Sequence, residues 1–342
     1  MQGEEILRMF PEKSRYRWQE AAKAAEKLQE IRLRADMPLS ILVDDRERFL
    51  DPHGKIVDRQ ECAARSTAGE LEEILAHLCQ YSIYAYADEI RQGFLTVQGG
   101  HRVGLAGLVI LEDNIRVRNL TYIRYLNIRI AHEKIGVAEP LLPYLYNSVG
   151  QVRNTLLISP PGCGKTTMLR DMIRSISDGT RYGAGMNVSV VDERSEIAGS
   201  YLGVAQNDVG CRTDVLDGCP KNEGMMMLIR AMAPQVLAVD DLGSLEDIQA
   251  LRMASGCGCR LLATIHGGSL EEVWNKKYMR YVTEDGLFER YVVLDRAQGV
   301  CRCPVIFFRE STAKKRCIGN GGNEIWNRKY LSWMMSRECE NW

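Results

Sequence analysis

The sequence has no long apolar segment and almost no net charge. Of its 342 residues, 44 are Lys or Arg and 45 are Asp or Glu, which leaves a formal net charge of −1. The longest apolar run, residues 103–111, is much shorter than the roughly 20 residues that cross a bilayer as a helix. We therefore expect a soluble protein, and the charge balance gives no general attraction to nucleic acid or to anionic lipid.

A secretory signal and a cysteine framework are also missing. The first residues, Met-Gln-Gly-Glu-Glu-Ile, are acidic and lack an apolar segment, so we expect no secretory signal. The 11 cysteines are odd in number and scattered, which is typical of reduced thiols in the cytoplasm. The C-x-C pairs at 257–259 and 301–303 fit a zinc site poorly, because structural zinc sites usually use C-x₂₋₄-C.

The centre of the chain has the pattern of a strand, a tight loop and a helix. Leu156–Ile158 has the length and apolarity of a buried strand. Residues 159–166 fit the phosphate-binding pattern G-x-x-x-x-G-K-[ST], with Ser159 in place of the first glycine. Helical spacing follows in Met168, Leu169, Met172, Ile173 and Ile176. A chance Gly/Pro turn before a lysine is the competing interpretation, but the flanking strand and helix are the context that this loop requires.

The residue types of this loop suit a nucleoside triphosphate. Gly162 and Gly164 let backbone N–H groups converge on phosphate oxygens, and the following helix directs its positive end towards them. Lys165 would contact the β- and γ-phosphates, and the Thr166 hydroxyl would hold Mg²⁺. We therefore predict ATP and Mg²⁺ as ligands. The predicted nucleotide-binding residues are Ser159, Pro160, Pro161, Gly162, Cys163, Gly164, Lys165, Thr166 and Thr167.

Strand and helix patterns alternate after this loop, at 187–191, 223–232, 235–239, 244–254, 260–265 and 270–275. This alternation predicts a P-loop NTPase core of the RecA-like or AAA-like kind, with a mostly parallel sheet and helices on both faces. The preceding part has grouped strands and two helical stretches, 14–30 and 67–90, which predict a smaller α+β domain. We predict an N-terminal domain over 1–135, a linker over 136–150, the ATPase domain over 151–310 and a tail over 311–342.

Carboxylates follow two of the predicted strands. Asp240, at the end of an apolar strand, is predicted to hold Mg²⁺ with Thr166. Asp241 occupies the place where related ATPases often carry the Glu that polarises the attacking water, and its side chain is one methylene shorter. Glu193 and Glu196 compete with Asp241 for the role of general base, and the sequence does not choose among the three. Each of them alone is equally well explained as part of a solvated loop.

A third strand end carries His266, which could sense the γ-phosphate, although a single histidine is more often structural. With Lys165 and the three acids, it completes the predicted catalytic set. Phosphoryl transfer often uses a further cation from a neighbouring subunit. The candidates are Arg102, Arg129, Arg194 and Arg212, and for each one a solvated surface arginine is the simpler explanation.

These motifs together resemble the stage III sporulation protein AA family of endospore-forming bacteria, which is in turn similar to secretion and type IV pilus motor ATPases. The matching stretches run from about residue 30 to 275: 30–34, 82–86, 91–94, 99–107, 127–131, 159–167, 191–197, 236–243 and 263–267. The run Gly99-Gly-His-Arg-Val-Gly-Leu-Ala-Gly107 is more specific than the phosphate-binding loop itself.

The resemblance implies an ATP-hydrolysing motor that works as a homo-oligomeric ring of six subunits. It implies a cytoplasmic location on the mother-cell side, peripheral to the membrane through partners, and docking on a membrane channel or secretion complex of the sporulation septum. Two alternatives stay open: a nucleic-acid-dependent P-loop ATPase, against which the near-neutral charge argues, and a nucleotide-binding ring scaffold with little turnover. The Asp at 241 departs from the motor pattern and puts efficient hydrolysis, but not nucleotide binding, in question.

Overall fold

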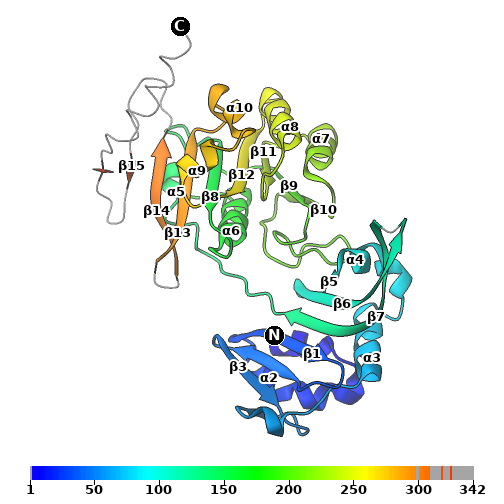
Figure 1. The fold of residues 1–342 in the computed structure, drawn as a ribbon. Coiled ribbons are helices and arrows are strands. Elements are labelled where there is room, and N and C mark those ends of the chain that lie inside the picture. Colours follow the sequence, from blue (N-terminus) through cyan, green and yellow to red (C-terminus); the bar gives the residue numbers. More distant parts are fainter. Residues whose placement is uncertain (1, 114, 298–299, 309–316, 319–323, 326–342) are drawn as a thin grey trace. The chain divides into compact units, whose positions relative to one another are not determined.

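The structure is a computed structural model that describes residues 2–113, 115–297, 300–308, 317–318 and 324–325. The chain forms two compact units (Figure 1). The first comprises residues 1–132 together with 199–207, and the second comprises residues 133–198 together with 208–342.

The first unit is a seven-stranded antiparallel sheet packed against helices. Its strand order is β4-β3-β2-β1-β7-β6-β5. The strands are β1 (Leu28–Arg34), β2 (Ser40–Val43), β3 (Arg46–Leu50), β4 (Ile56–Val57), β5 (Phe94–Val97), β6 (His101–Glu112) and β7 (Arg116–Arg129). The helices are α1 (Gln2–Arg8), η1 (Glu12–Trp18), α2 (Gln19–Lys23), η2 (Gln60–Cys62), α3 (Ala68–Leu78), η3 (Ile83–Tyr86) and α4 (Ala87–Gln92).

Both long helices predicted in this unit are shorter than expected. The predicted helix 14–30 is wrong beyond residue 23, because the chain enters β1 at Leu28, and η1 is a 3₁₀ helix in which Trp18 stacks on Phe10. Helix α3 begins at a capping box formed by Thr67 and Glu70. It ends early because the positive φ angles of Gln80 and Tyr81 turn the backbone out of the helix.

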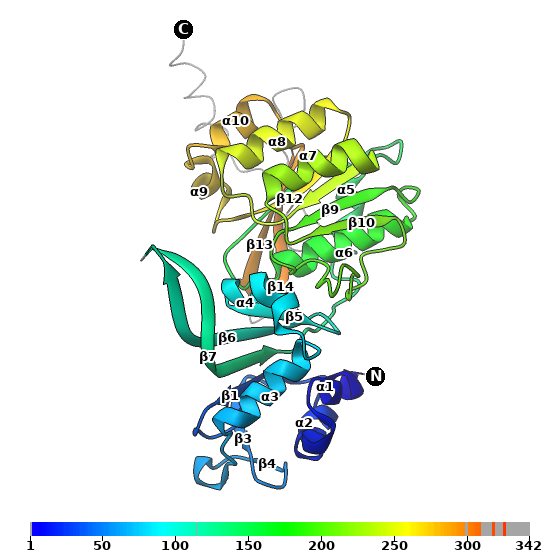
Figure 2. The ribbon, with the colours of Figure 1, turned by 90° about the vertical axis from the view of Figure 1, so that its right-hand side faces the viewer.

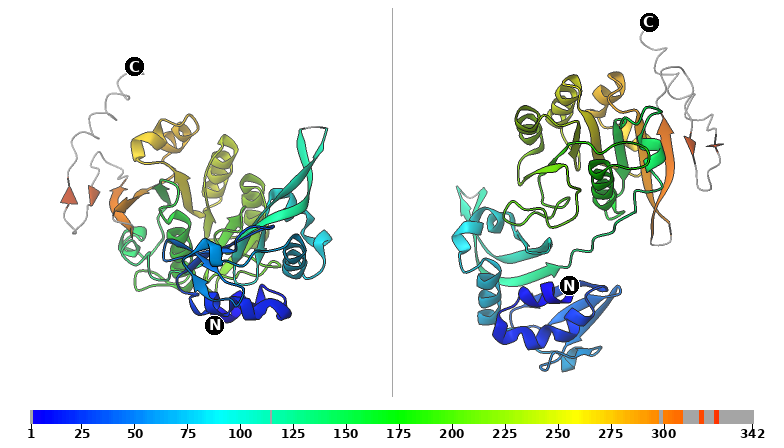
Figure 3. Two further views of the ribbon diagram at one scale, coloured as in Figure 1. Left: turned by 60° about the horizontal axis from the view of Figure 1, so that its bottom comes forward. Right: turned by 180° about the vertical axis from the view of Figure 1, so that it is seen from behind.

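Strands β6 and β7 form a hairpin that continues beyond the rest of the sheet (Figures 2 and 3). Its apolar residues Leu108, Val109, Ile110 and Leu111 are 42–57% exposed. In the buried part of the same strand, Val103 and Leu105 face the core of the unit. Of the apolar run 103–111, only the first part therefore packs in the core of the unit, and the second part is exposed.

The second unit is a nine-stranded sheet of order β10-β9-β11-β12-β8-β13-β14-β15-β16. It is parallel from β10 to β13 and antiparallel beyond. The strands are β8 (Thr155–Ser159), β9 (Val188–Asp192), β10 (Thr213–Asp217), β11 (Val236–Val239), β12 (Arg260–His266), β13 (Arg290–Ala297), β14 (Val300–Phe308), β15 (Cys317–Ile318) and β16 (Glu324–Ile325). The helices are α5 (Leu142–Leu145), α6 (Lys165–Asp178), α7 (Lys221–Met232), α8 (Leu245–Gly256), α9 (Leu270–Trp274) and α10 (Met279–Glu284).

Helices cover both faces of the parallel strands, which confirms the predicted fold class. Helices α7 to α10 share one apolar core with the strand residues that point to their side, among them Ile158, Val239 and Ile265. Helix α6 packs against β8, β9, β10 and β12 on the opposite side of the sheet (Figure 2). Parallel strands end together at one edge, so the residues after β8, β9, β10, β11 and β12 gather there.

Two segments differ from the expected domain plan. Residues 199–207, expected within the ATPase domain, belong to the first unit, because Tyr201 packs on the core of that unit and Gln206 accepts a hydrogen bond from Gly99 N. Residues 136–150, expected as a linker, belong to the second unit and include α5. The tail expected from residue 311 lies outside the described residues except for β15 and β16.

Candidate nucleotide-binding site

The predicted phosphate-binding loop joins the buried strand β8 to α6. Gly162 and Gly164 have φ angles of 75° and 76°, which residues with a Cβ rarely adopt, so both glycines are required by the turn. Ser159 is fully buried and its hydroxyl donates to Pro160 O at 2.8 Å. A serine at the first position of the pattern therefore supports the turn through its side chain. Lys165 and Thr166 stand in the first turn of α6.

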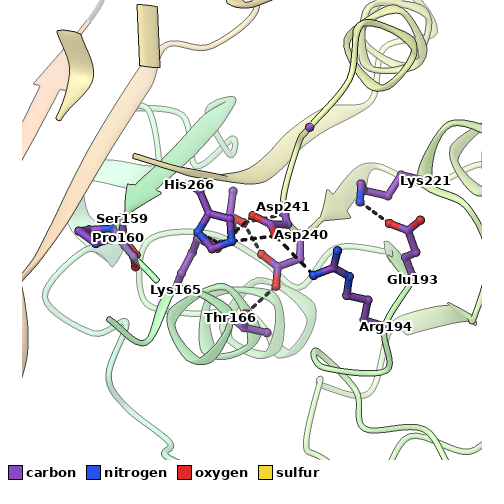
Figure 4. Close-up of polar contacts among 12 residues, drawn as sticks. Ser159, Pro160, Lys165, Thr166, Glu193, Arg194, Lys221, Asp240, Asp241 and His266 are labelled. Atoms are coloured by element: carbon purple, nitrogen blue, oxygen red, sulfur yellow. Dashed lines mark hydrogen bonds and ion pairs between the residues drawn. The ribbon is translucent and has the colours of Figure 1, made fainter. Parts of the chain in front are cut away.

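Lys165 lies at the centre of a charged cluster (Figure 4). Its side chain is almost buried, and Nζ donates to Asp241 Oδ1 at 2.9 Å. His266 contacts both partners, with Nδ1 3.2 Å from Lys165 Nζ and Nε2 2.9 Å from Asp241 Oδ2. Partial burial opposes ionisation of Asp241, but the hydrogen bond and charge of Lys165, helped by His266 and Arg194, outweigh it and lower the pKa of this carboxyl. Asp241 is thus an ionised counter-charge to Lys165.

Asp240 connects two hydroxyl groups. Its Oδ2 accepts from Thr166 Oγ1 at 2.6 Å, and its Oδ1 accepts from Thr264 Oγ1. Thr264 also accepts from Asp241 N at 2.9 Å, so β12 holds both strand-end acids in place. A hydroxyl and a carboxylate that converge in this way are the hard oxygen donors that Mg²⁺ prefers. The residues present therefore fit a Mg²⁺ ion held between Thr166 and Asp240.

In the acidic segment 192–196, at the end of β9, Asp192 fixes the backbone that follows it. Asp192 is buried, and its carboxylate accepts hydrogen bonds from the backbone N–H groups of Glu196, Ile197 and Ala198. Burial raises the pKa of Asp192 to about 6, against the lowering effect of these hydrogen bonds. Arg170 of α6 donates to the carbonyl oxygens of Glu196 and Ile197. The segment 196–198 is thereby fixed to the helix that begins at the phosphate-binding loop.

Glu193 forms an ion pair with Lys221, the first residue of α7 (Figure 4). Sequence reasoning missed Lys221 because it missed β10. The pattern Thr213-Asp-Val-Leu-Asp217 alternates only weakly and lies in a stretch rich in Gly and Asp, yet it forms a parallel strand beside β9. Once β10 is recognised, residues 218–221 must lie at the same edge as the other strand ends. Pro220, just before the helix predicted from residue 223, was the available signal, because proline is common at the start of a helix.

A cavity of about 300 Å³ lies over the loop and collects most of the predicted residues. Apart from Ser159 and Cys163, every predicted nucleotide-binding residue lines it, together with Glu193, Glu196, Asp240, Asp241 and His266. Asp192, Arg194 and Lys221 line it as well. The structure thus brings the three candidate general bases into one cavity with the loop, at the size usual for small-molecule sites.

The candidate arginines are distributed more widely. Arg194 reaches Asp241 Oδ2 at 4.0 Å from a largely exposed position. Arg212 precedes β10, at the opposite edge of the sheet, where it donates to Ser177 O. Arg102 and Arg129 are register partners on β6 and β7 of the first unit, and Arg102 stacks over Phe94. In one copy of the chain, only Arg194 of these four lines the cavity.

Solved structures of bacterial ATPases and of a pilus motor share this fold. The structure is similar to the ATPase DotB of Yersinia pseudotuberculosis, with a TM-score of 0.57 and 11% identity over 96% of this chain and 84% of that one. It is also similar to the DotB ATPase of Legionella pneumophila, with a TM-score of 0.53 and 11% identity over 95% and 83% of the two chains. The pilus retraction motor PilT matches with a TM-score of 0.52 and 12% identity over 92% and 83%.

Sequence comparison identifies the family. The family model described as "Sporulation stage III, protein AA" matches residues 1–313. Stage III sporulation protein AA of Bacillus subtilis (strain 168) is 40% identical over 292 residues, which cover 85% of this chain and 90% of that protein. The chain therefore belongs to the stage III sporulation protein AA family. Within its described part, no helix is both long enough and apolar enough to cross a membrane.

Proposed function

We propose that this protein is a Mg²⁺-dependent ATPase that works as a ring-shaped motor and powers or assembles a membrane channel or secretion complex during endospore formation. Membership of a sporulation family and the secretion-ATPase fold support the proposal. The observation that carries it is the convergence of Lys165, Thr166 and Asp240 at the carboxyl edge of the parallel sheet. This grouping supplies a cation for the phosphates and oxygen ligands for the metal.

In this site each residue has a defined task. Backbone N–H groups of the loop and Lys165 bind the phosphates, and Thr166 with Asp240 would hold Mg²⁺, which when bound neutralises charge that develops on the phosphates. An acid of the set Asp241, Glu193 and Glu196 orients the attacking water and accepts its proton. His266, held between Lys165 and Asp241, is placed to respond to a γ-phosphate that contacts Lys165.

The site assignment is tested by Lys165→Ala. We expect the affinity for Mg-ATP to fall at least about tenfold and turnover to disappear, because the variant removes a charge-assisted contact to the phosphates. Binding is measured by calorimetry and turnover by phosphate release. The matched control is Lys277→Ala, which removes an exposed lysine of the same unit and should change neither quantity. Unchanged binding and turnover in Lys165→Ala would show that the nucleotide binds elsewhere or not at all.

A nucleotide-binding ring scaffold with little turnover is the second candidate. The observation that favours it is the pairing of Asp241 with Lys165 and His266, which lowers the basicity of the acid that stands where motors often carry Glu. A purified ring that binds Mg-ATP tightly but releases no phosphate would establish the scaffold. Turnover that rises only when single-stranded nucleic acid is added would instead favour a nucleic-acid-dependent ATPase.

We further propose that the protein acts in the cytoplasm on the mother-cell side of the septum, attached to the membrane through partner proteins. The family assignment supports this location. Fractionation of sporulating cells tests it: the protein should sediment with membranes from cells that make its partners and stay in the supernatant when expressed alone.

A further inference from the structure

Lys221 is a nearly buried lysine in the cavity that none of the predicted roles uses. Its side chain is 12% exposed, and it lines the cavity together with the phosphate-binding loop. A lysine is seldom withdrawn from water without a charged partner, because its ammonium group is strongly hydrated. The partner here is Glu193, whose side chain is 37% exposed and lines the same cavity (Figure 4).

Two separate strands bring this pair together. Glu193 follows directly after β9, and Lys221 follows β10 after a short turn that ends at Pro220, the N-cap of α7. Strands β9 and β10 are parallel and in register up to the pair Asp192 and Asp217. Both residues therefore emerge from the same edge of the sheet, and the first turn of α7 holds the lysine stem in place.

Each of the two lysines that line the cavity pairs with one of its carboxylates. Lys165 Nζ donates to Asp241 Oδ1 at 2.9 Å, so the lysine predicted to bind phosphate already occupies one oxygen of that acid. Lys221 pairs with Glu193 through Oε2, and a carboxylate has a second oxygen, Oε1, to accept a proton from water. A carboxylate with one oxygen anchored is restricted in rotation, which is what orientation of a water molecule requires.

We propose that Lys221 is a positioning residue for ATP hydrolysis that acts through Glu193. This inference rests on the proposed ATPase function and deepens it. The water oxygen forms a bond to the γ-phosphorus while the bond from that phosphorus to the β–γ bridging oxygen breaks. The bridging oxygen leaves with the electron pair as part of ADP, and Glu193 takes the proton that the water loses. Lys221 holds one oxygen of the Glu193 carboxylate and so fixes its orientation for this transfer.

The test uses the full-length chain and four variants: Lys221→Met, Lys221→Arg, Glu193→Gln and the double variant Glu193→Gln/Lys221→Met. Methionine keeps the apolar stem of lysine and removes its charge, and arginine keeps the charge. For each variant, kcat is measured by phosphate release and the Kd for a non-hydrolysable Mg-ATP analogue by calorimetry. Lys277→Met, at an exposed position of the same unit, is the control for loss of a lysine.

We expect Lys221→Met and Glu193→Gln each to lower kcat by about 10²-fold, the usual size of a lost proton acceptor, with Kd within about twofold of wild type. Lys221→Met should cause no further loss in the Glu193→Gln background, because the lysine acts only through the glutamate. Lys221→Arg should recover most of the turnover. A merely structural role would change Kd and kcat together and would not show this dependence on Glu193.

Three results would overturn the inference: full turnover in Lys221→Met, losses that multiply in the double variant, or a loss confined to Kd. The last result would identify Lys221 as a phosphate ligand. A wild-type protein that binds Mg-ATP without turnover would overturn the proposed ATPase function and this inference with it. If wild type turns over ATP but the losses of kcat from the two single variants multiply in the double variant, only the inference about Lys221 fails. A failure of the inference is therefore distinguishable from a failure of the proposed ATPase function.

Discussion

At the scale of single residues, buried charge decides how this site responds to pH. Asp192 is withdrawn from water, and its three backbone donors only partly replace the lost hydration, so its pKa rises to about 6. Asp241 shows the opposite balance, because Lys165 lies against it and lowers its pKa. The same residue type is thus more easily protonated on one strand end and less easily on another, according to whether a cation is present.

The first residue-scale prediction concerns Asp192→Asn. The folded protein binds the Asp192 proton more tightly than the unfolded chain, so the contribution of Asp192 to the free energy of unfolding falls as pH rises from about 4 to about 6. Over that window the contribution falls by about 3 kcal/mol, since each pKa unit is worth about 1.4 kcal/mol. The Asp192→Asn variant has no carboxyl at this position, so its free energy of unfolding lacks this decrease with pH.

Thermal unfolding of both proteins between pH 4 and pH 7 tests this. The Tm of Asp192→Asn relative to wild type should rise with pH across the window and stay level above it. Because both proteins contain the other acids, the contributions of those acids to the pH dependence of Tm cancel in the comparison. Asp241 is one of them, and its lowered pKa makes its contribution to stability fall as pH decreases. Parallel Tm curves for the two proteins would contradict the prediction.

At the scale of elements, the segment 199–207 is the most informative. It leaves the acidic segment directly after Ala198, whose N–H is held by Asp192, and it packs within the first unit. There Tyr201 lies against Gln80 and Tyr86, and Gln206 accepts from Gly99 N at 3.0 Å. The turn Gly99-Gly100, part of the most specific motif in the sequence, has φ angles of 87° and 71°. One role of that motif is therefore to present a backbone N–H to the segment 199–207.

The prediction at this scale is that Gln206→Ala speeds amide hydrogen exchange at Gly99. Removal of the acceptor should raise the exchange rate up to about tenfold, because a hydrogen bond contributes about 1 kcal/mol net. Gln206→Glu keeps an acceptor oxygen and should stay close to wild type. The exchange rate is measured by mass spectrometry on peptides that cover 96–104. An unchanged Gly99 exchange rate in Gln206→Ala would show that the hydrogen bond from Gly99 N to Gln206 does not protect this amide.

At the scale of the whole molecule, the site of one copy contains few unpaired cations. Lys165 and Lys221 are both engaged by carboxylates, and Arg194 is the candidate arginine that lines the cavity. Transition-state charge on the γ-phosphate calls for a further cation, which a neighbouring subunit of a ring could supply. Arg102 and Arg129, on adjacent strands of the first unit, are the candidates that a neighbour would bring.

The proposed ring predicts turnover that depends on assembly. We expect specific activity to fall on dilution as rings dissociate, with monomers below about 1% of ring activity, because an arginine supplied in trans contributes about 10³-fold or more. Subunit number is followed by mass photometry at each concentration at which phosphate release is measured. Specific activity that stays constant down to the fully monomeric form would argue for a site complete within one chain.

The phosphate-binding loop and the strand-end acids could be predicted from the sequence because their signals are local. Gly162, Gly164 and Lys165 lie within one turn of chain, and Asp240 follows directly after an apolar strand. The alternation of strands and helices was equally local, and it led to the correct fold class. The helix predicted over 14–30 failed beyond residue 23 because residues from Leu28 pair with β2 and β7 as strand β1, and these tertiary contacts outweigh helix propensity.

The sequence by itself determined the loop, the lysine and the strand-end carboxylates of the proposed nucleotide site, since each is specified by residues next to one another in the chain. Only the tertiary structure decided which carboxylate faces which cation. The pairs Lys165–Asp241 and Glu193–Lys221 join residues 76 and 28 positions apart, and they exist because parallel strands end at one edge of the sheet. Contacts of that kind depend on strand order, which no local pattern encodes.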